Sequence, residues 1–337
     1  MNLSIGIVGL PNVGKSTLFK ILTKQEVNIA NYPFATIDPN IGIVPVPDKR
    51  LQKLAKLSNS KKIIPAVVKF YDIAGLVKGA NKGEGLGNQF LSHIREVDAI
   101  VEVVRCFKSS EIIHVENKVD PIGDIEIINT ELILKDLETI EKRLAKLEAE
   151  ARSDKKKVKD FELLKKIKMG LDKGIMVVNQ KEILADFKKS VLFKELSLLT
   201  AKPQIYLLNG SESDVSEELK NKIKSLEADY LTINLLDTEN IDELIKRAYQ
   251  ILNLISFLTT GEDETRAWTI EKGTKAPQAA GVIHTDFENK FIRAEVINWQ
   301  KLLEAGGWNQ AKQKGLIRLE GKDYVVQDGD VMVIRHG

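Results

Sequence analysis

Short apolar runs alternate with helical patterns over the first hundred or so residues of the chain. The runs have strand length and cover residues 3–8, 41–46, 63–71 and 99–104. Between them, apolar side chains recur at helical spacing in residues 18–22, 48–57 and 90–97. Two later strands, at residues 204–208 and 230–235, precede an amphipathic helix at 237–254. This alternation predicts an α/β fold in which helices flank a mainly parallel sheet.

A long helical segment interrupts the alternation between about residues 121 and 202. Its apolar side chains step by four and three, as in a heptad seam, at Ile133, Leu137, Ile140, Leu144 and Leu147. A lysine-rich amphipathic stretch at residues 155–169 follows a break at 152–154 and can pack back antiparallel. We therefore predict an inserted antiparallel coiled coil at 121–202. It divides one nucleotide-binding domain into residues 1–120 and 203–254.

The C-terminal part of the chain, from about residue 255, has a different pattern. Short strand-like segments lie at residues 266–270, 291–297, 324–326 and 331–334, with glycine-rich turns between them. No long helix is expected before residues 299–305. The pattern predicts a compact α+β module at 255–337. Within it, His284 is more typical of a structural or surface histidine than of a catalytic one.

The strongest motif of the chain is a phosphate-binding loop. Residues 9–17 read GLPNVGKST and match G-x-x-x-x-G-K-[ST] at every fixed position, between a predicted strand and a predicted helix. The glycines let the backbone wrap a phosphate, and the N–H groups at the helix start attract the anion. We expect Lys15 to reach the β- and γ-phosphates and the Ser16 hydroxyl to bind Mg²⁺.

Two further stretches match loops that close on the nucleotide in switch-type P-loop proteins. Thr36 lies where such a loop places a threonine over Mg²⁺ and the γ-phosphate, although a bond to its own backbone is the alternative. Residues 72–75 read DIAG, which places Asp72 beside Mg²⁺ and the Gly75 amide near the γ-phosphate. Leu76 stands where Ras-like proteins carry the water-orienting glutamine. Hydrolysis is therefore either very slow or aided by a group from elsewhere.

A literal N-K-x-D, the guanine-reading motif of GTPases, occurs at residues 117–120. That motif belongs at the end of the next parallel strand, and a parallel connection needs about a dozen residues, normally a helix. Only eleven residues, 105–115, are available for it. The next strand ends instead in an N-x-x-E, from Asn209 to Glu212. The longer Glu212 displaces the acceptor that reads guanine, so we expect guanine preference to be lost.

Composition excludes several classes of protein. The 50 basic and 48 acidic residues nearly cancel to a net charge of +2, so any nucleic-acid surface must be a local patch. The one cysteine, Cys106, excludes an intramolecular disulfide and a multi-cysteine metal site. There is no charged leader and no apolar run of about 18 residues. We expect a cytoplasmic protein without a membrane partner.

Taken together, the motifs resemble those of the YchF-type Obg-like ATPases, essentially from end to end. The resemblance is carried by residues 9–17, 32–40 and 72–80, and in the C-terminal module by 266–268 and 276–284. It implies a translation-factor-class G domain, an inserted coiled coil and a C-terminal TGS domain of β-grasp type. It also implies ATP hydrolysis in preference to GTP and association with ribosomes. RNA contact through the coiled coil and the TGS domain is a further expectation, against the alternative of a merely solvated basic helix.

The same resemblance assigns roles to single residues. The phosphates are surrounded by Asn12, Val13, Gly14, Lys15, Ser16 and Thr17. Ser16 and Thr36 hold Mg²⁺, and the backbone of Asn209 and Gly210 meets the adenine. His114, in the loop after the strand at 99–104, orients or deprotonates water, unless it is only an exposed loop histidine. Lys15, Gly75 and His114 are thus the expected catalytic residues.

Two details extend or limit the resemblance. Residues 11–16 read PNVGKS, as in P-loops of GTPases that lack the glutamine and are stimulated by K⁺. The carbonyl oxygen of Asn12 is the candidate K⁺ ligand, with capping of its own loop as the alternative. Residues 235–237 read LLD where the family usually shows Ser-Ala, so the resemblance does not assign the residues that form the outer wall of the base pocket.

Two other functions remain open at this point. An Obg-class GTPase would use residues 117–120 as its base reader. A nucleotide-gated RNA or ribosome binder would hydrolyse nucleotide only incidentally, because Leu76 removes the usual catalytic group.

Overall fold

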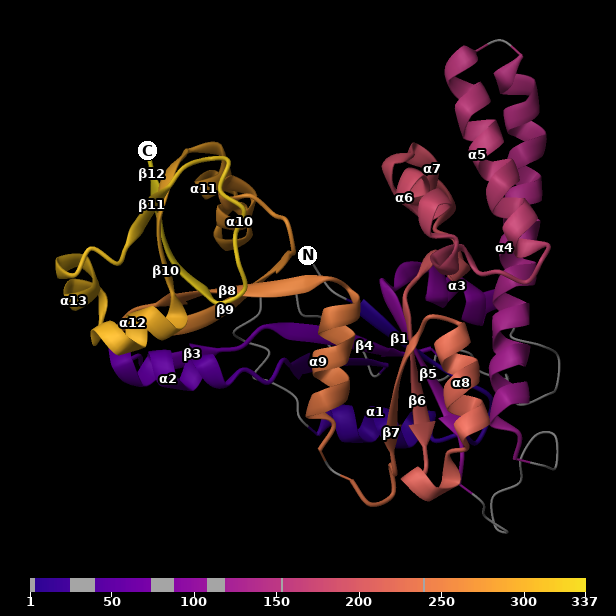
Figure 1. Cartoon of the computed structure of the whole chain (residues 1–337), viewed down its shortest axis with the longest axis horizontal. Coiled ribbons are helices and arrows are strands. Elements are labelled where there is room, and N and C mark those ends of the chain that lie inside the picture. The colour runs from indigo at the N-terminus through magenta and orange to yellow at the C-terminus, as the bar shows by residue number, and fades with distance from the viewer. Residues whose placement is uncertain (1–3, 25–39, 74–87, 108–118, 153, 239) are drawn as a thin grey trace.

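The computed structural model describes residues 4–24, 40–73, 88–107, 119–152, 154–238 and 240–337, and its α/β architecture confirms the predicted class (Figure 1). The first sheet has the strand order β2-β4-β1-β5-β6-β7. These strands are β1 Ser4–Val8, β2 Ile41–Pro45, β4 Val67–Asp72, β5 Ala99–Arg105, β6 Gln204–Asn209 and β7 Asp229–Ile233. Only β2 pairs antiparallel in this sheet. The carboxyl ends of the parallel strands therefore meet at one edge.

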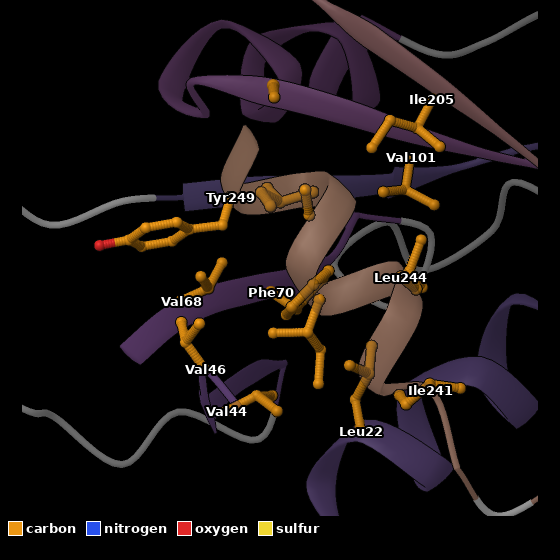
Figure 2. Close-up of a cluster of buried hydrophobic side chains, with 14 of the residues drawn as sticks. Leu22, Val44, Val46, Val68, Phe70, Val101, Ile205, Ile241, Leu244 and Tyr249 are labelled. Carbon is orange, nitrogen blue, oxygen red and sulfur yellow. The ribbon is translucent and has the colours of Figure 1, made fainter. Parts of the chain in front are cut away.

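Helices α1 Lys15–Thr23 and α9 Asp242–Ile251 pack on one face of this sheet. Leu22 of α1 and Leu244 of α9 are fully buried in the same core as Phe70 and Val101 (Figure 2). β5 is buried along its whole length, as is typical of a parallel strand that is covered on both faces.

The opposite face of β5 and β6 packs against α4 Pro121–Ala151 and α8 Glu217–Ser225. Glu102 of β5 is fully buried on this face beside Tyr206, and no residue in the described part of the chain hydrogen-bonds its carboxyl. Burial, reinforced by the nearby Asp124, raises the pKa of Glu102 well above its usual value. The folded protein therefore favours the neutral form of this side chain.

The inserted coiled coil is confirmed. α4 and α5 Lys155–Leu171 run antiparallel (Figure 1), and Ile140 and Leu147 of the heptad seam are fully buried with Leu164 and Ile167 of α5. Two short helices that the sequence pattern did not predict, α6 Lys181–Lys189 and α7 Val191–Leu196, pack against the same cluster. The insertion is therefore a small helical domain and not a bare hairpin.

A buried carboxylate fastens this insertion to the sheet. Asp136 of α4 is fully buried and accepts hydrogen bonds from the N–H groups of Leu199 and Thr200, at 2.9 and 2.8 Å. The Thr200 hydroxyl donates to it as well, at 2.7 Å. Residues 199–201 lead directly into β6, so these bonds fix the base of the coiled coil relative to the sheet.

The C-terminal part forms a second, mixed sheet with the order β11-β10-β12-β8-β9-β3. Its own strands are β8 Leu254–Thr260, β9 Glu264–Glu271, β10 Phe291–Asn298, β11 Arg318–Glu320 and β12 Asp330–His336. Its helices are α10 Ala276–Ile283, α11 Thr285–Asn289, α12 Trp299–Ala305 and α13 Trp308–Gln313. This agrees with the expected α+β module, and α12 has the bounds that the sequence predicts.

The remaining strand of this sheet comes from the first half of the chain, and the single strand expected at residues 63–71 is wrong. Pro65 has no N–H for a strand ladder, so the chain breaks there. β3 Lys62–Ile64 leaves the first sheet and pairs parallel with β9. α2 Lys49–Ser58 precedes it, and Arg50 at its start bridges Asp48 and Asp328, at 2.8 Å each.

Several smaller expectations also need correction or confirmation. Residues 324–326 form no strand, only an isolated bridge between Lys275 and Val325. α10 is an eight-residue helix where none was expected, and a proline in its first turn favours that start. α9 is shorter than the expected 237–254, because β8 begins at Leu254.

His284 is structural, since its Nδ1 accepts a hydrogen bond from the Asp286 N–H at 3.2 Å. The division of the chain at residues 121, 203 and 255 stays a prediction.

Replacing Glu102 with Gln tests the buried acid. A carboxyl whose pKa is raised by folding stabilises the protein fully below its unfolded pKa, and this contribution is lost as the pH rises. Between about pH 5 and about pH 8, the melting temperature of the wild type should therefore fall relative to that of Glu102→Gln. For a chain of 337 residues, the difference in melting temperature should be about 1–2 °C for each kcal/mol of stability that the ionised carboxylate costs, measured by thermal unfolding. Glu304→Gln, at an exposed position of α12, is the control and should follow the wild type.

Candidate nucleotide site

The phosphate loop connects β1 to α1, as the motif predicts. Gly9 and Gly14 both have positive φ, at 145° and 110°. A Cβ at Gly9 would lie 2.5 Å from the Val103 carbonyl oxygen, and one at Gly14 would lie 2.4 Å from the Asn209 amide nitrogen. Only glycine fits at either position, because the neighbouring strands approach the loop so closely. The start of α1, capped by no side chain of the described residues, points its N–H groups at this loop.

Lys15 is held inside this loop. Its Nζ donates to the Leu10 carbonyl oxygen at 2.6 Å. Burial lowers the pKa of Lys15 to about 8, and the Asp72 carboxylate opposes this shift. Asp72 therefore lies within electrostatic reach of Lys15, at the carboxyl end of β4 and almost fully buried. The sequence prediction that places these two residues at one site agrees with this geometry.

The Mg²⁺ ligands proposed from the sequence are only partly described. Ser16 is exposed at the start of α1 and Asp72 ends β4, so a hydroxyl and a carboxylate reach the same edge of the sheet. Both are hard oxygen ligands of the kind that Mg²⁺ prefers. Thr36, Gly75 and His114 lie outside the described residues. Their expected roles stay predictions.

Asn209, the last residue of β6, joins the loops around the site. Its side chain is buried, its Nδ2 donates to the Val13 carbonyl oxygen at 2.8 Å, and its Oδ1 accepts from the Leu235 N–H at 3.1 Å. Its own carbonyl oxygen accepts from the N–H groups of Cys106 and Phe107, at 2.9 and 3.2 Å. The P-loop, the end of β5 and the turn after β7 therefore share one anchor.

A cavity of about 360 Å³ opens at this edge of the sheet. It is lined by Asn12, Gly14, Lys15, Ser16, Thr17, Phe107, Asn209, Leu235 and Leu236. Most of the predicted phosphate residues thus meet in one place. Val13 is buried beside the cavity and does not line it, and Gly210 turns its N–H toward the Ile233 carbonyl oxygen.

Sequence reasoning missed Phe107 as a lining residue. It comes two residues after the end of β5, at the edge where nucleotides bind in parallel sheets, and that position is the signal that could have found it. The buried Arg105 guanidinium lies 4.6 Å from the centre of its ring. The Arg105 Nε also donates to the Phe107 carbonyl oxygen, at 3.2 Å. The aromatic ring therefore packs against a buried guanidinium group of the protein.

The described part of the N-K-x-D stretch caps a helix. The Asp120 carboxylate accepts a hydrogen bond from the Gly123 N–H at 3.1 Å and is the N-cap of α4. The crossover from β5 to β6 runs through α4, and none of the described residues between β5 and α4 forms a strand. Asn117 and Lys118 lie outside the described residues. Glu212 does follow β6, as predicted, but it is exposed and its Oε2 lies 3.7 Å from the Lys220 ammonium.

Two family models match the chain. One, described as "50S ribosome-binding GTPase", matches residues 4–136, and YchF-GTPase_C, described as "Protein of unknown function (DUF933)", matches residues 254–337. The "Ribosome-binding ATPase YchF" of Bacillus subtilis is 48% identical over 99% of both chains, and that of Mycoplasma genitalium is 47% identical over 98% of both. The solved structure of the Schizosaccharomyces pombe YchF GTPase has a TM-score of 0.86 at 40% identity, and covers 99% of this chain and 98% of its own.

The chain belongs to the YchF family. Membership confirms the resemblance drawn from the P-loop, from residues 72–80 and from the C-terminal motifs. The printed names of the relatives differ on the nucleotide, since the bacterial ones are called ATPases and the yeast structure a GTPase. No helix among the described residues is long and apolar enough to cross a membrane.

The lowered pKa of Lys15 predicts proton uptake when a nucleotide binds. Phosphate oxygens beside the ammonium favour its charged form, so binding raises a pKa that starts at about 8. Near about pH 8.5 ATP binding should take up a fraction of one proton, and near about pH 6.5 Lys15 should take up none. Calorimetry in two buffers of different ionisation enthalpy measures this. Lys20→Met, at an exposed position of α1, should keep the uptake and Lys15→Met should lose it. A binding enthalpy independent of buffer at the higher pH would contradict the prediction.

Proposed function

We propose that the chain is a slow, ribosome-associated P-loop hydrolase of the cytoplasm that prefers ATP to GTP. The observation that carries the proposal is the cavity in which the P-loop, Asn209 and the turn after β7 meet. The bacterial relatives named "Ribosome-binding ATPase YchF" support both the reaction and the partner. The lysine-rich α5 and the C-terminal module are the proposed ribosome or RNA contacts.

The P-loop residues would bind and orient the triphosphate. Backbone N–H groups at the start of α1 donate to the β-phosphate, and the Lys15 ammonium exchanges the Leu10 carbonyl oxygen for a phosphate oxygen. Ser16 and Asp72, with Thr36, would hold Mg²⁺, which neutralises phosphate charge when bound. The Gly75 amide and His114 are the proposed groups at the γ-phosphate and the water, because Leu76 cannot orient it.

The residues around the described cavity support a loss of guanine preference. Guanine readers place a carboxylate against the base edge. Here the Asp120 carboxylate is committed to the start of α4, and Glu212 does not line the cavity. Neither carboxylate therefore lines the described cavity, which supports the proposal over that of an Obg-class GTPase.

Titrations of the purified protein with ATP and GTP test this proposal. We expect the wild type to bind ATP more tightly, and Asp120→Ala to keep the same ratio of affinities. That variant should lose only some thermal stability, because an N-cap is removed. GTP binding at least about tenfold tighter than ATP binding, or a ratio that changes in Asp120→Ala, would restore residues 117–120 as the base reader.

Potassium dependence tests the role proposed for Asn12. Asn12 is exposed, lines the cavity and has a φ of 62°, a conformation that asparagine tolerates. A K⁺ ion held by its carbonyl oxygen would neutralise charge that develops between the β- and γ-phosphates. Steady-state ATPase should be faster in K⁺ than in Na⁺ at equal ionic strength, by up to about a hundredfold, the low end of what one lost stabilising group costs.

Asn12→Asp should change this ratio, since aspartate also tolerates the left-handed backbone but alters the charge of the ligand. Equal wild-type rates in the two salts would remove the ion from the proposed mechanism.

A further inference from the structure

We propose that Leu236 is an apolar wall on which the purine base of the bound nucleotide stacks, and that it adds affinity without selecting between adenine and guanine. The inference rests on the proposed nucleotide-binding function and deepens it. The ligand class is a purine nucleoside triphosphate. Leu236 stands where the resembling family usually shows a small polar motif, so the proposal concerns this chain in particular.

Leu236 is exposed in a way that stability alone does not explain. Its side chain is 74% exposed, whereas the adjacent Leu235 is only 3% exposed. Both leucines line the cavity beside the P-loop. An apolar side chain on the wall of a cavity open to water gains from any flat apolar surface that displaces water from it. A purine face is such a surface.

Hydrogen bonds hold this wall in place. Asn234 accepts the Leu236 N–H on its Oδ1 at 3.2 Å and the Asp237 N–H on its carbonyl oxygen at 3.2 Å. The Asn234 Nδ2 also donates to the Asp237 carboxylate. The Leu235 N–H is bound by Asn209, which in turn binds the P-loop at Val13. The position of Leu236 is therefore tied to the phosphate site.

The geometry of the cavity places a base beside Leu236. The phosphates occupy the start of α1, and the Leu235 Cδ1 lies only 3.3 Å from where a Cβ on Gly14 would be, so the wall begins next to the phosphate loop. The same cavity is also lined by Phe107, Asn209 and Leu236, which lie at the carboxyl ends of the neighbouring strands β5, β6 and β7. A nucleotide that is bound by its phosphates thus brings its base to these two apolar residues.

Stacking on Leu236 cannot distinguish the two purines. Adenine and guanine differ at their edges, and both present a flat ring face. The carboxylates that could read an edge, Asp120 and Glu212, do not line the cavity. Leu236 should therefore strengthen the binding of ATP and GTP by the same factor.

Calorimetric titration of the full-length protein with ATP, GTP and inorganic tripolyphosphate, each with Mg²⁺, tests the proposal. Leu236→Ala should weaken ATP and GTP binding equally, by about three- to tenfold, because part of a leucine side chain no longer covers the base. Binding of tripolyphosphate, which has no base, should be unchanged. Leu236→Met keeps the apolar volume and should restore wild-type affinities. Leu319→Ala removes a leucine that is 62% exposed in β11, away from the cavity, and should behave as the wild type.

Three outcomes would overturn the inference: wild-type ATP affinity in Leu236→Ala, a loss confined to one purine, or an equal loss for tripolyphosphate. The second would indicate an edge contact, and the third would indicate a disturbed P-loop. If the wild type binds tripolyphosphate but neither ATP nor GTP, it is the proposed function that fails.

Discussion

The hydrogen bonds of the Asn209 side chain hold the nucleotide cavity together. One amide bonds the P-loop at Val13 and the turn after β7 at Leu235, and the carbonyl oxygen of the same residue bonds the end of β5. These segments are far apart in the sequence, and the amide is almost fully buried. A buried amide that loses a partner costs about 1–3 kcal/mol, so the three loops are constrained to keep one arrangement. The P-loop and the turn that carries Leu235 and Leu236 are therefore linked at one edge of the sheet.

The two sheets are joined through the segment between β2 and β4. α2 and β3 leave the nucleotide-binding sheet, and β3 becomes the outer strand of the C-terminal sheet beside β9. Arg50 bridges Asp48 and Asp328, and Asp328 also accepts the Ser256 N–H at 3.0 Å. Leu54 of α2 and Leu258 of β8 belong to the same buried core as Ile7. The C-terminal module is thus packed against residues that lead directly to Asp72.

The sequence predicted those parts of the fold that are encoded by residues close together in the chain. The P-loop, the heptad seam and α12 were found because contiguous residues encode them. The strand at 63–71 was wrong because an apolar run does not show which sheet it joins, and Pro65 ends the run's hydrogen-bond ladder. α10 was missed because glycine and alanine are frequent in it and its apolar period is weak. For residues 117–120, counting residues to the next strand predicts that they do not read the base, and this stays a prediction; Asp120, at the described end of this stretch, caps α4.

By itself the sequence determined the chemistry of the phosphate site, because a strand, a glycine-rich loop and a helix start lie within one short stretch of chain. It also determined the family, through motifs spread over the whole length. Only the tertiary structure decided which other residues line the cavity beside the P-loop. Phe107, Asn209 and Leu236 meet because β5, β6 and β7 are neighbours in the sheet and their carboxyl ends share one edge. No local sequence pattern encodes this arrangement, because it depends on the order of the strands and on hydrogen bonds between residues that are distant in the sequence.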